Sequence, residues 1–473
     1  MCAQDQVVAE WLQILTAADV PAAMVQETAA LLKDPQYCLN GVAQVNDPMV
    51  GLIEQMGLPI RLSETPGQVK GAAPIFDAHA PLPSESMQGN VKHQTHAQAS
   101  TLAPLKGIRV LEIANLIAGP MVGRLLADLG AEVIKLESVA GGDIARRKGS
   151  PGFLPLNSGK RGVAFNLRST AGQPLGQHLA RWADVVIDNM RPGVAETLGM
   201  GWELLGKLNP RLVYCHVTAF GSRGPYAHKP GLDPLAGALT GVQQIQGAYC
   251  GKAVYLQVAV VDHTTALLAC NGVLLALIAR ERTEKGQRVE TSLLDGAALI
   301  NAHELTAYAG KPPRAGLPRT QWGLHALHSL YETADGWLCL TLEQKRQWPA
   351  LCEALARYKL CADTRFADAT ARLQLDEALT AALTTAFCQH TTAWWIAKLE
   401  TAGVPCAPVA ADFNRNFVCD AQTVANEIIV TQQHATLGEV QMAHQWLRFS
   451  GAPNTCTRPT PLLGQHTDEL LTG

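Results

Sequence analysis

The hydrophobic pattern alternates between short apolar runs and helically spaced stretches from Leu105 onward. Apolar runs predict strands at residues 108–113, 132–137, 162–167, 184–188 and 211–217. Helical spacing predicts one helix at 121–129 and another from Ser169 to Trp182. Strands that alternate with helices of this length indicate an α/β fold with a doubly wound, mostly parallel, Rossmann-like sheet.

Ligands of such sheets bind beyond the carboxyl ends of the strands. The loops at these ends span residues 115–120, 189–193 and 220–233. We therefore expect the functional site in these three loops. A further strand is predicted at 287–295.

One carboxylate lies where an apolar run, residues 258–261, passes into an Ala- and Leu-rich helical pattern from about 264 to 281. Asp262 has two compatible interpretations at this position. As an N-cap, the commoner role, it accepts hydrogen bonds from the first free N–H groups of the helix. As a nucleophile, it is a carboxylate that the helix N-terminus keeps ionised and oriented.

The second half of the chain predicts a smaller domain. An Asp-Gly turn inside residues 331–341 indicates a hairpin, and amphipathic helices are predicted at 347–356, 376–387 and 392–402. We place a large α/β domain at 105–310, a Pro- and Arg-rich crossover at 311–325 and a smaller α+β domain at 326–430. The last segment, 431–473, is predicted to return to the large domain as a tail.

The beginning of the chain resembles its end. Three segments recur in the same order at nearly one spacing, and we interpret residues 1–80 as a partial tandem repeat of the C-terminal segment. Residues 81–104 are polar and aperiodic, which predicts a linker. The matching segments are 18–25 and 402–409, 60–66 and 447–453, and 74–79 and 461–466.

Composition narrows the function. A formal net charge of -3 provides no basic surface for nucleic acid or a membrane. The first residues lack the basic-then-apolar pattern of a signal peptide, and no window has 18 uninterrupted apolar residues, so we expect neither a signal peptide nor a transmembrane helix. The 12 cysteines include no C-x-x-C pair, so we expect free thiols and a cytoplasmic protein. His93 and His96 lie in the polar linker, and no metal site is predicted.

Many short motifs, taken together in order, resemble the class III CoA-transferases of the formyl-CoA and carnitine CoA-transferase type. Each motif alone is weakly specific, but their number and order make the resemblance specific over residues 105–473. The matching segments are 105–112, 118–120, 129–137, 142–143, 157–161, 189–193, 208–214, 220–225, 286–289 and 461–469.

The resemblance implies that Asp262 is the catalytic nucleophile. Its carboxylate would attack an acyl-CoA thioester, the released CoA thiolate would form an aspartyl-CoA thioester, and a small carboxylic acid would then accept the CoA. CoA is thus implied as part of a substrate, with no tightly bound cofactor. Family members form dimers of interlocked chains, so a homodimer is expected.

The resemblance also implies CoA contacts in three loops, at Leu116, Ile117 and Ala118, at Asn166, Leu167 and Arg168, and at Asn189 and Met190. Apolar loop residues would enclose the adenine, and Arg168, Lys160 or Arg161 would pair with phosphates. A solvated surface pair is the alternative for Lys160 and Arg161.

The sequence departs from the family in two places. Ser138 stands where a basic residue is frequent, and the glycine-rich loop of some transferases has no clear equivalent between Gly310 and His328.

Three other functions compete with CoA transfer. Related α-methylacyl-CoA racemases use a histidine at the position of Leu232, which cannot move a proton. A dinucleotide oxidoreductase would need a G-x-G-x-x-G loop, which the first loop lacks. A non-catalytic CoA-binding paralogue is disfavoured by the presence of Asp262.

Overall fold

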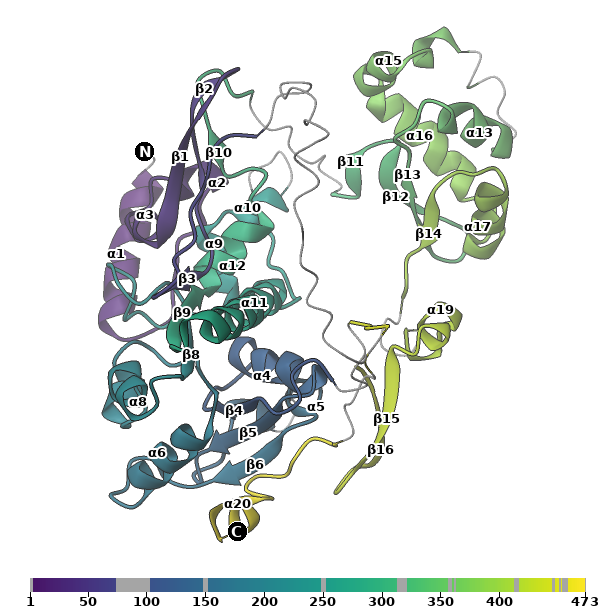
Figure 1. Cartoon of the computed structure of the whole chain (residues 1–473). Helices are drawn as coiled ribbons and strands as arrows, with labels where there is room; N and C mark the ends of the chain where they lie inside the picture. Colours follow the sequence, from purple (N-terminus) through teal and green to yellow (C-terminus); the bar gives the residue numbers. More distant parts are fainter. Residues whose placement is uncertain are drawn as a thin grey trace, which may run out of the picture. The chain divides into compact units, whose positions relative to one another are not determined.

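The computed structural model describes residues 3–73, 103–147, 152–247, 252–312, 321–355, 360, 363–411, 417–444, 447–450, 452 and 458–472. The chain divides into two compact units (Figure 1). The larger unit comprises Met1–Val242, Tyr255–Lys311 and Gln422–Gly473, and the smaller unit comprises Gln243–Val254 and Pro312–Ala421. Most of the predicted linker, 81–104, lies outside the described residues.

A seven-stranded sheet forms the centre of the larger unit, in the order β3-β9-β8-β7-β4-β5-β6. All neighbouring strands are parallel except β3 and β9. The predicted α/β fold with a mostly parallel sheet is therefore confirmed. The strands are β3 (Arg61–Leu62), β4 (Arg109–Glu112), β5 (Glu132–Glu137), β6 (Arg161–Ala164), β7 (Val185–Asp188), β8 (Val213–Thr218) and β9 (Gln287–Ser292).

Helices cover both faces of this sheet. Successive residues of a strand point to opposite faces, so neighbouring residues pack against different helices. Val110 packs in one apolar cluster with residues of α4 (Ala118–Asp128), α11 (Val260–Thr283) and α12 (Leu293–Ile300). Leu111 packs in a second cluster with residues of α6 (Gly172–Trp182) and α8 (Trp202–Leu208). Helices on the two faces make the sheet doubly wound.

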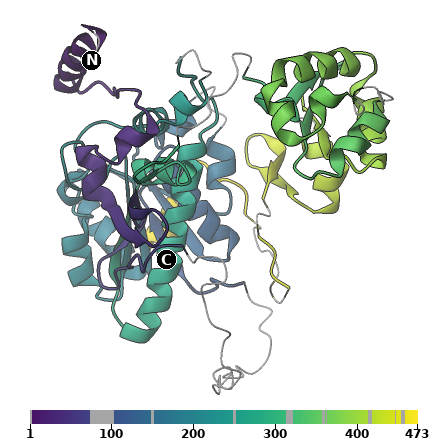
Figure 2. The ribbon, with the colours of Figure 1, turned by 90° about the horizontal axis from the view of Figure 1, so that it is seen from above.

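The N-terminal segment belongs to the larger unit (Figure 2). Its hairpin, β1 (Val42–Asp47) and β2 (Gly51–Met56), forms a three-stranded sheet with β10 (Thr306–Ala307), and β3 extends the central sheet. Leu31 and Tyr37 lie in an apolar cluster with Phe220 and Leu294. Three helices complete the segment: α1 (Ala3–Ala17), α2 (Thr28–Leu31) and α3 (Pro35–Gly41).

The C-terminal segment lies against the opposite edge of the sheet. His466 Nδ1 accepts a hydrogen bond from Gly162 N–H at 3.0 Å, and Thr467 Oγ1 accepts one from Ala164 N–H at 3.0 Å. The remaining elements of the larger unit are a 3₁₀ turn (Ile144–Arg146), α5 (Phe153–Asn157), α7 (Val194–Thr197), α9 (Asp233–Leu239), β15 (Ile429–His434), β16 (Gly438–Ala443) and α20 (Thr467–Thr472), with α10 (Val242–Ile245) and α19 (Ala421–Ala425) at the unit boundaries.

Several predicted boundaries are wrong, including those at the starts of α11 and α12. The long helix α11 begins at Val260 rather than near 264, so the apolar run before Asp262 is already helical. Strand β9, predicted to continue to residue 295, ends at Ser292, because the Ser292 hydroxyl accepts a hydrogen bond from Asp295 N–H and caps α12. Apolar runs of this length do not distinguish a strand from a buried helix.

Helix α11 is also long and apolar enough to cross a membrane by length and composition, which the search for uninterrupted apolar runs missed. More than half of its most apolar window is buried, and it contributes Ala266, Ala269 and Val273 to the core under the sheet. It is the central core helix of the larger unit.

A cluster of fully buried charges lies under the first βα loop. The Glu112 carboxylate pairs with Lys135 Nζ at 2.8 Å and with Lys160 Nζ at 2.6 Å, and Lys135 also pairs with Asp143 at 3.0 Å. Gly123 on α4 allows this packing, since a Cβ there would overlap the Glu112 carboxylate.

Lys160 is therefore neither a solvated loop residue nor a phosphate ligand, and both predictions for it are wrong. Burial lowers the pKa of Lys160 to about 7. Arg161 pairs with Glu132 at 2.8 Å and with Glu469 at 2.5 Å.

The smaller unit is α+β. Its antiparallel sheet has the order β11-β12-β13-β14, and the predicted Asp-Gly hairpin joins β12 to β13. The apolar core of this unit includes Leu338, Leu351 and Phe387. The elements are β11 (Gly323–His325), β12 (His328–Glu332), β13 (Trp337–Thr341), α13 (Gln347–Ala354), a 3₁₀ turn (Thr364–Phe366), α15 (Ala369–Gln374), α16 (Asp376–Phe387), α17 (Thr392–Thr401) and β14 (Cys406–Pro408).

The prediction of free thiols is wrong at one cysteine. Cys352, on α13, is disulfide-bonded, whereas the other described cysteines are free. Sequence spacing does not reveal which cysteines meet in the fold.

We expect Glu112→Gln to lower the free energy of unfolding by about 3–5 kcal/mol, because two buried ammonium groups would lose their shared carboxylate. Glu203→Gln, on the exposed face of α8, is the control. Urea denaturation followed by circular dichroism measures both variants. Equal stability of the two variants would contradict the structural role of this cluster.

Candidate active site

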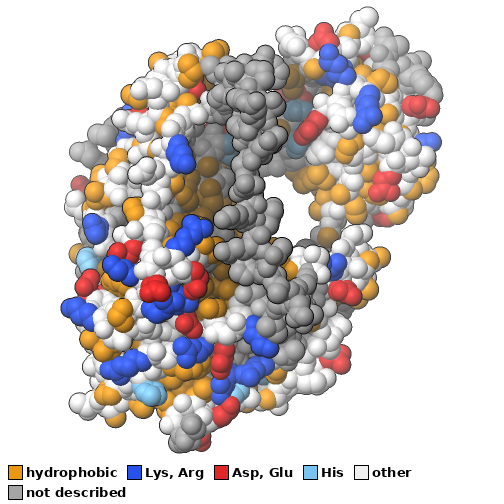
Figure 3. Space-filling view, in the orientation of Figure 1, with side chains coloured by type: hydrophobic (Ala, Val, Ile, Leu, Met, Phe, Trp, Pro, Cys, Tyr) orange, Lys and Arg blue, Asp and Glu red, His pale blue; other side chains and the backbone are white. Residues whose placement is uncertain are grey.

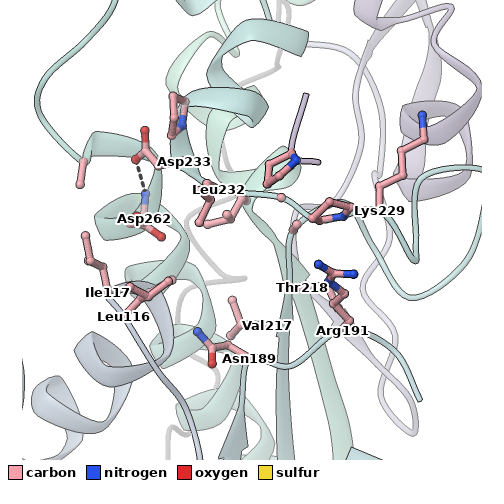
Figure 4. Close-up of a pocket in the computed structure, with 18 of the residues that line it drawn as sticks. Leu116, Ile117, Asn189, Arg191, Val217, Thr218, Lys229, Leu232, Asp233 and Asp262 are labelled. Atoms are coloured by element: carbon pink, nitrogen blue, oxygen red, sulfur yellow. Dashed lines mark hydrogen bonds between the residues drawn. The ribbon is translucent and has the colours of Figure 1, made fainter. Parts of the chain in front are cut away.

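A cavity of about 520 Å³ opens in the larger unit beyond the carboxyl ends of β4, β7 and β8, beside the start of α11 (Figure 4). All three loops that the sequence analysis selected contribute to its wall. The lining residues are Pro21, Leu116, Ile117, Ala118, Asn189, Met190, Arg191, Pro192, Val217, Thr218, Ala219, Ala227, Lys229, Pro230, Gly231, Leu232, Asp233, Pro234, Tyr255, Leu256, Gln257, Val258, Ala259, Asp262 and Leu293.

Asp262 projects into this cavity from the first turn of α11. The backbone N–H of Ala118 donates a hydrogen bond to its carboxylate, which favours the ionised form. Burial and then the nearby Asp233 carboxylate act in the other direction and raise the pKa of Asp262 to about 7. Asp262 is therefore a partly desolvated carboxylate with unusual basicity.

The helix cap is a different residue from the one that the sequence indicated. Helix α11 has Ala259 at its N-cap position and Asp262 inside the first turn. The Asp233 carboxylate, at the start of α9, accepts hydrogen bonds from the N–H groups of Val261 and of Asp262, the latter at 2.9 Å (Figure 4). These first-turn N–H groups are thus already used and are not available to stabilise an oxyanion.

Two loops that carry cavity residues hold each other in place. Asn115 N–H donates to Asn189 Oδ1 at 2.9 Å, and Asn189 Nδ2 donates to Asn115 O at 2.7 Å. Leu116 has a positive φ of 67° and its N–H donates to Asp143 Oδ1 at 3.0 Å. Such a conformation costs energy in a leucine, so the buried charge cluster that contains Asp143 supports a strained loop at the cavity.

The structure brings together most of the residues expected at the site. Leu116, Ile117, Ala118, Asn189 and Met190 line the cavity with Asp262. The other three expected CoA contacts, Asn166, Leu167 and Arg168, follow the edge strand β6 and are not among the lining residues. Arg168 is exposed, and its N–H donates to Asn166 Oδ1 at 2.9 Å.

Sequence analysis missed four lining residues that carry charge or come from a distant segment. Asp233 falls only within the predicted loop at residues 220–233, and Arg191 only within the family motif at residues 189–193. Arg191 lies across the cavity from Asp262 and Asp233, whereas the Lys229 side chain points away from them, with its Nζ 4.2 Å from the centre of the Tyr226 ring (Figure 4). Pro21 comes from the N-terminal segment, and no local pattern indicates that it reaches the site.

None of the described residues that line this cavity is a histidine. Leu232 lines the cavity at the position where a racemase needs its acid–base histidine. His263 and His228 are exposed and lie outside the lining. The described residues also contain no group of His, Cys, Asp and Glu that could hold a metal ion.

Charges of both signs occur on one face of the protein. On the face shown in Figure 3, basic and acidic side chains are interspersed.

Comparison with known proteins gives the family. The model of CoA-transferase family III matches residues 1–80 and 105–467. A succinyl-CoA:glutarate CoA-transferase from Mus musculus is 30% identical over 382 residues, which is 79% of this chain and 87% of the relative. A succinate–glutarate CoA-transferase from Agrobacterium fabrum is 32% identical over 78% of this chain and 95% of the relative.

Solved structures agree with the sequence relatives. The crystal structure of a CAIB/BAIF family protein from Brucella suis superposes with a TM-score of 0.71 and 30% sequence identity, and the match covers 78% of this chain and 99% of that chain. The chain belongs to CoA-transferase family III. It is an enzyme that moves CoA from an acyl-CoA donor to a carboxylic acid acceptor.

We expect kcat/KM for CoA transfer to rise with pH around a midpoint of about 7, because the Asp262 carboxylate is protonated as the pH falls through its raised pKa. Asp233→Asn keeps an oxygen that caps α11 but removes the charge, so its midpoint shifts to lower pH. His263→Gln is the control and keeps the wild-type midpoint. A shift in the histidine variant instead would assign the profile to His263.

Proposed function

We propose that Asp262 is the nucleophile of this CoA-transferase. Its carboxylate oxygen attacks the thioester carbonyl of the acyl-CoA donor, the C–S bond breaks, and CoA leaves as a thiolate. The product is a mixed anhydride between the acyl group and Asp262. The thiolate then attacks the aspartyl carbonyl, which releases the donor acid as a carboxylate and leaves an aspartyl-CoA thioester.

The second half of the reaction repeats these steps in reverse. The acceptor carboxylate attacks the aspartyl thioester and expels CoA thiolate, which forms a second mixed anhydride. The thiolate attacks the acceptor carbonyl, the new acyl-CoA leaves, and the Asp262 carboxylate is regenerated. No net proton transfer is needed, which fits a cavity lining without a histidine.

The environment of Asp262 is the observation that carries this proposal. A carboxylate that burial and a like charge make more basic is a stronger nucleophile at neutral pH. Asp233 and Ala118 fix it from two sides through the hydrogen bonds to its backbone and side chain. The reacting oxygen is thus held in one orientation before substrate binds.

We further propose that the enzyme acts on dicarboxylic acids. Arg191 lies across the cavity from Asp262, so a substrate with one carboxyl group at Asp262 can place a second near this cation. The relatives named above act on succinyl-CoA and glutarate, which carry such a second carboxyl group.

We also propose a homodimer and a duplicated segment, each supported by one feature of the larger unit. Helix α11 exposes Leu267, Leu275 and Ile278 to about half of their surface, an apolar stripe that suits contact with a second copy. The hairpins β1–β2 and β15–β16 have equal strand lengths and equivalent register, with Val42 paired to Met56 and Ile429 to Ala443. This supports a duplicated segment. Asn166, Leu167 and Arg168 stay proposed CoA contacts.

We expect Asp262→Asn to abolish CoA transfer from succinyl-CoA, because an amide cannot form the anhydride. CoA binding, measured by isothermal titration calorimetry, remains within about threefold of wild type since the amide preserves shape. Transfer at more than a few per cent of the wild-type rate would contradict the proposed nucleophile.

We expect Arg191→Gln to lower the ratio of kcat/KM for glutarate to that for pentanoate by about tenfold or more, the cost of a charge-assisted hydrogen bond. These acids share a five-carbon chain and differ in the second carboxylate. Arg181→Gln, on the exposed surface of α6, is the matched control. An unchanged ratio with weaker binding of every acyl-CoA would instead assign Arg191 to the phosphates of CoA.

A further inference from the structure

The N-terminal segment reaches the active-site cavity. Pro21 is a lining residue, although it lies far in sequence from every other residue of the wall. Two residues earlier, the Asp19 carboxylate forms an ion pair with Arg191 NH1 at 2.7 Å. Gln26 N–H donates to Ala238 O at 2.9 Å, which fixes the segment between these points against α9.

Further contacts anchor the segment to residues 220–226, which directly precede a stretch of the cavity wall. Gln36 Nε2 donates to Phe220 O at 2.9 Å, and Tyr226 N–H donates to Gln36 Oε1 at 2.8 Å. Asn40 Nδ2 also donates to Phe220 O, at 3.0 Å. These are buried or partly buried contacts, so the segment has a fixed position relative to the cavity.

Asp19 has a conformation that a carboxylate tolerates. It lies just beyond the end of α1 with a φ of 54°, in the left-handed region, and its N–H donates to Thr16 O at 3.1 Å. Asp and Asn adopt this conformation more readily than most residues. The turn that follows α1 thus places the Asp19 carboxylate beside Arg191.

We propose that Asp19 is a specificity-determining residue that competes with the second carboxylate of the substrate for Arg191. This inference rests on the proposed contact between Arg191 and a dicarboxylic acid. The Asp19 carboxylate has the same charge and geometry as the group that Arg191 would bind. Both side chains are substantially exposed, at 66% for Asp19 and 44% for Arg191, so the pair is weak and readily exchanged.

The consequence concerns the choice among acids. A dicarboxylic acid must displace Asp19 from Arg191, whereas a monocarboxylic acid leaves the pair intact. Asp19 therefore reduces the preference that Arg191 creates for a second carboxylate. Through Asp19 the N-terminal segment influences the active site directly.

The test compares Asp19→Asn with Glu10→Gln in the full-length enzyme. Both remove one negative charge from the same segment, but Glu10 is an exposed residue of α1, and asparagine keeps the left-handed conformation at residue 19. With succinyl-CoA as donor, we expect the kcat/KM ratio of glutarate to pentanoate to rise about two- to fivefold in Asp19→Asn, as loss of an exposed ion pair permits. Glu10→Gln keeps the wild-type ratio.

The double variant Asp19→Asn/Arg191→Gln separates the two proposals. Competition predicts that removal of Asp19 has no effect on the ratio once Arg191 is absent. A lower or unchanged ratio in Asp19→Asn, while Arg191→Gln alone lowers it, overturns the role of Asp19 and leaves the dicarboxylate site standing. An unchanged ratio in Arg191→Gln alone overturns both.

Discussion

The hydrogen bond from the Asp262 N–H to the Asp233 carboxylate joins the two helix starts at which the chemistry is concentrated. It caps α11 and brings two carboxylates close together at the wall of a partly closed cavity. The cost is electrostatic, because burial disfavours the charged form of Asp262 and the Asp233 carboxylate repels it, and both effects raise the pKa of Asp262. The remaining architecture makes this arrangement tolerable: the sheet holds α11, and the Ala118 N–H compensates the Asp262 carboxylate.

The buried charge cluster also fixes the geometry of the site, from its position under the first βα loop. Glu112, Lys135, Lys160 and Asp143 form ion pairs with one another, and Asp143 also accepts a hydrogen bond from the N–H of Leu116 in its strained conformation. Buried ions seldom increase stability over an apolar core, but they fix geometry wherever each partner is satisfied. In this fold they fix the loop that presents Ala118 to Asp262.

The sequence predicted the α/β class, the parallel strands and three of the cavity loops, because these depend on local hydrophobic period and on a general rule for such sheets. It located Asp262 but assigned the cap to it. The cap comes from Asp233, which only tertiary contact brings near. The prediction for Lys160 was wrong for the same reason, because the local sequence of a polar loop does not show that its lysine pairs with a buried glutamate in the fold. Pro21 and Asp19 reach the site because a segment distant in sequence folds against it. Hydrophobic periodicity does not predict such a contact.

The central claim is a covalent aspartyl thioester at Asp262, and trapping tests it most directly. The enzyme is incubated with succinyl-CoA and then hydroxylamine, digested, and analysed by peptide mass spectrometry. The account predicts a hydroxamate on the peptide that contains Asp262, formed only when the acyl-CoA is present. A hydroxamate on another residue, or none in an enzyme that is turning over, would contradict it.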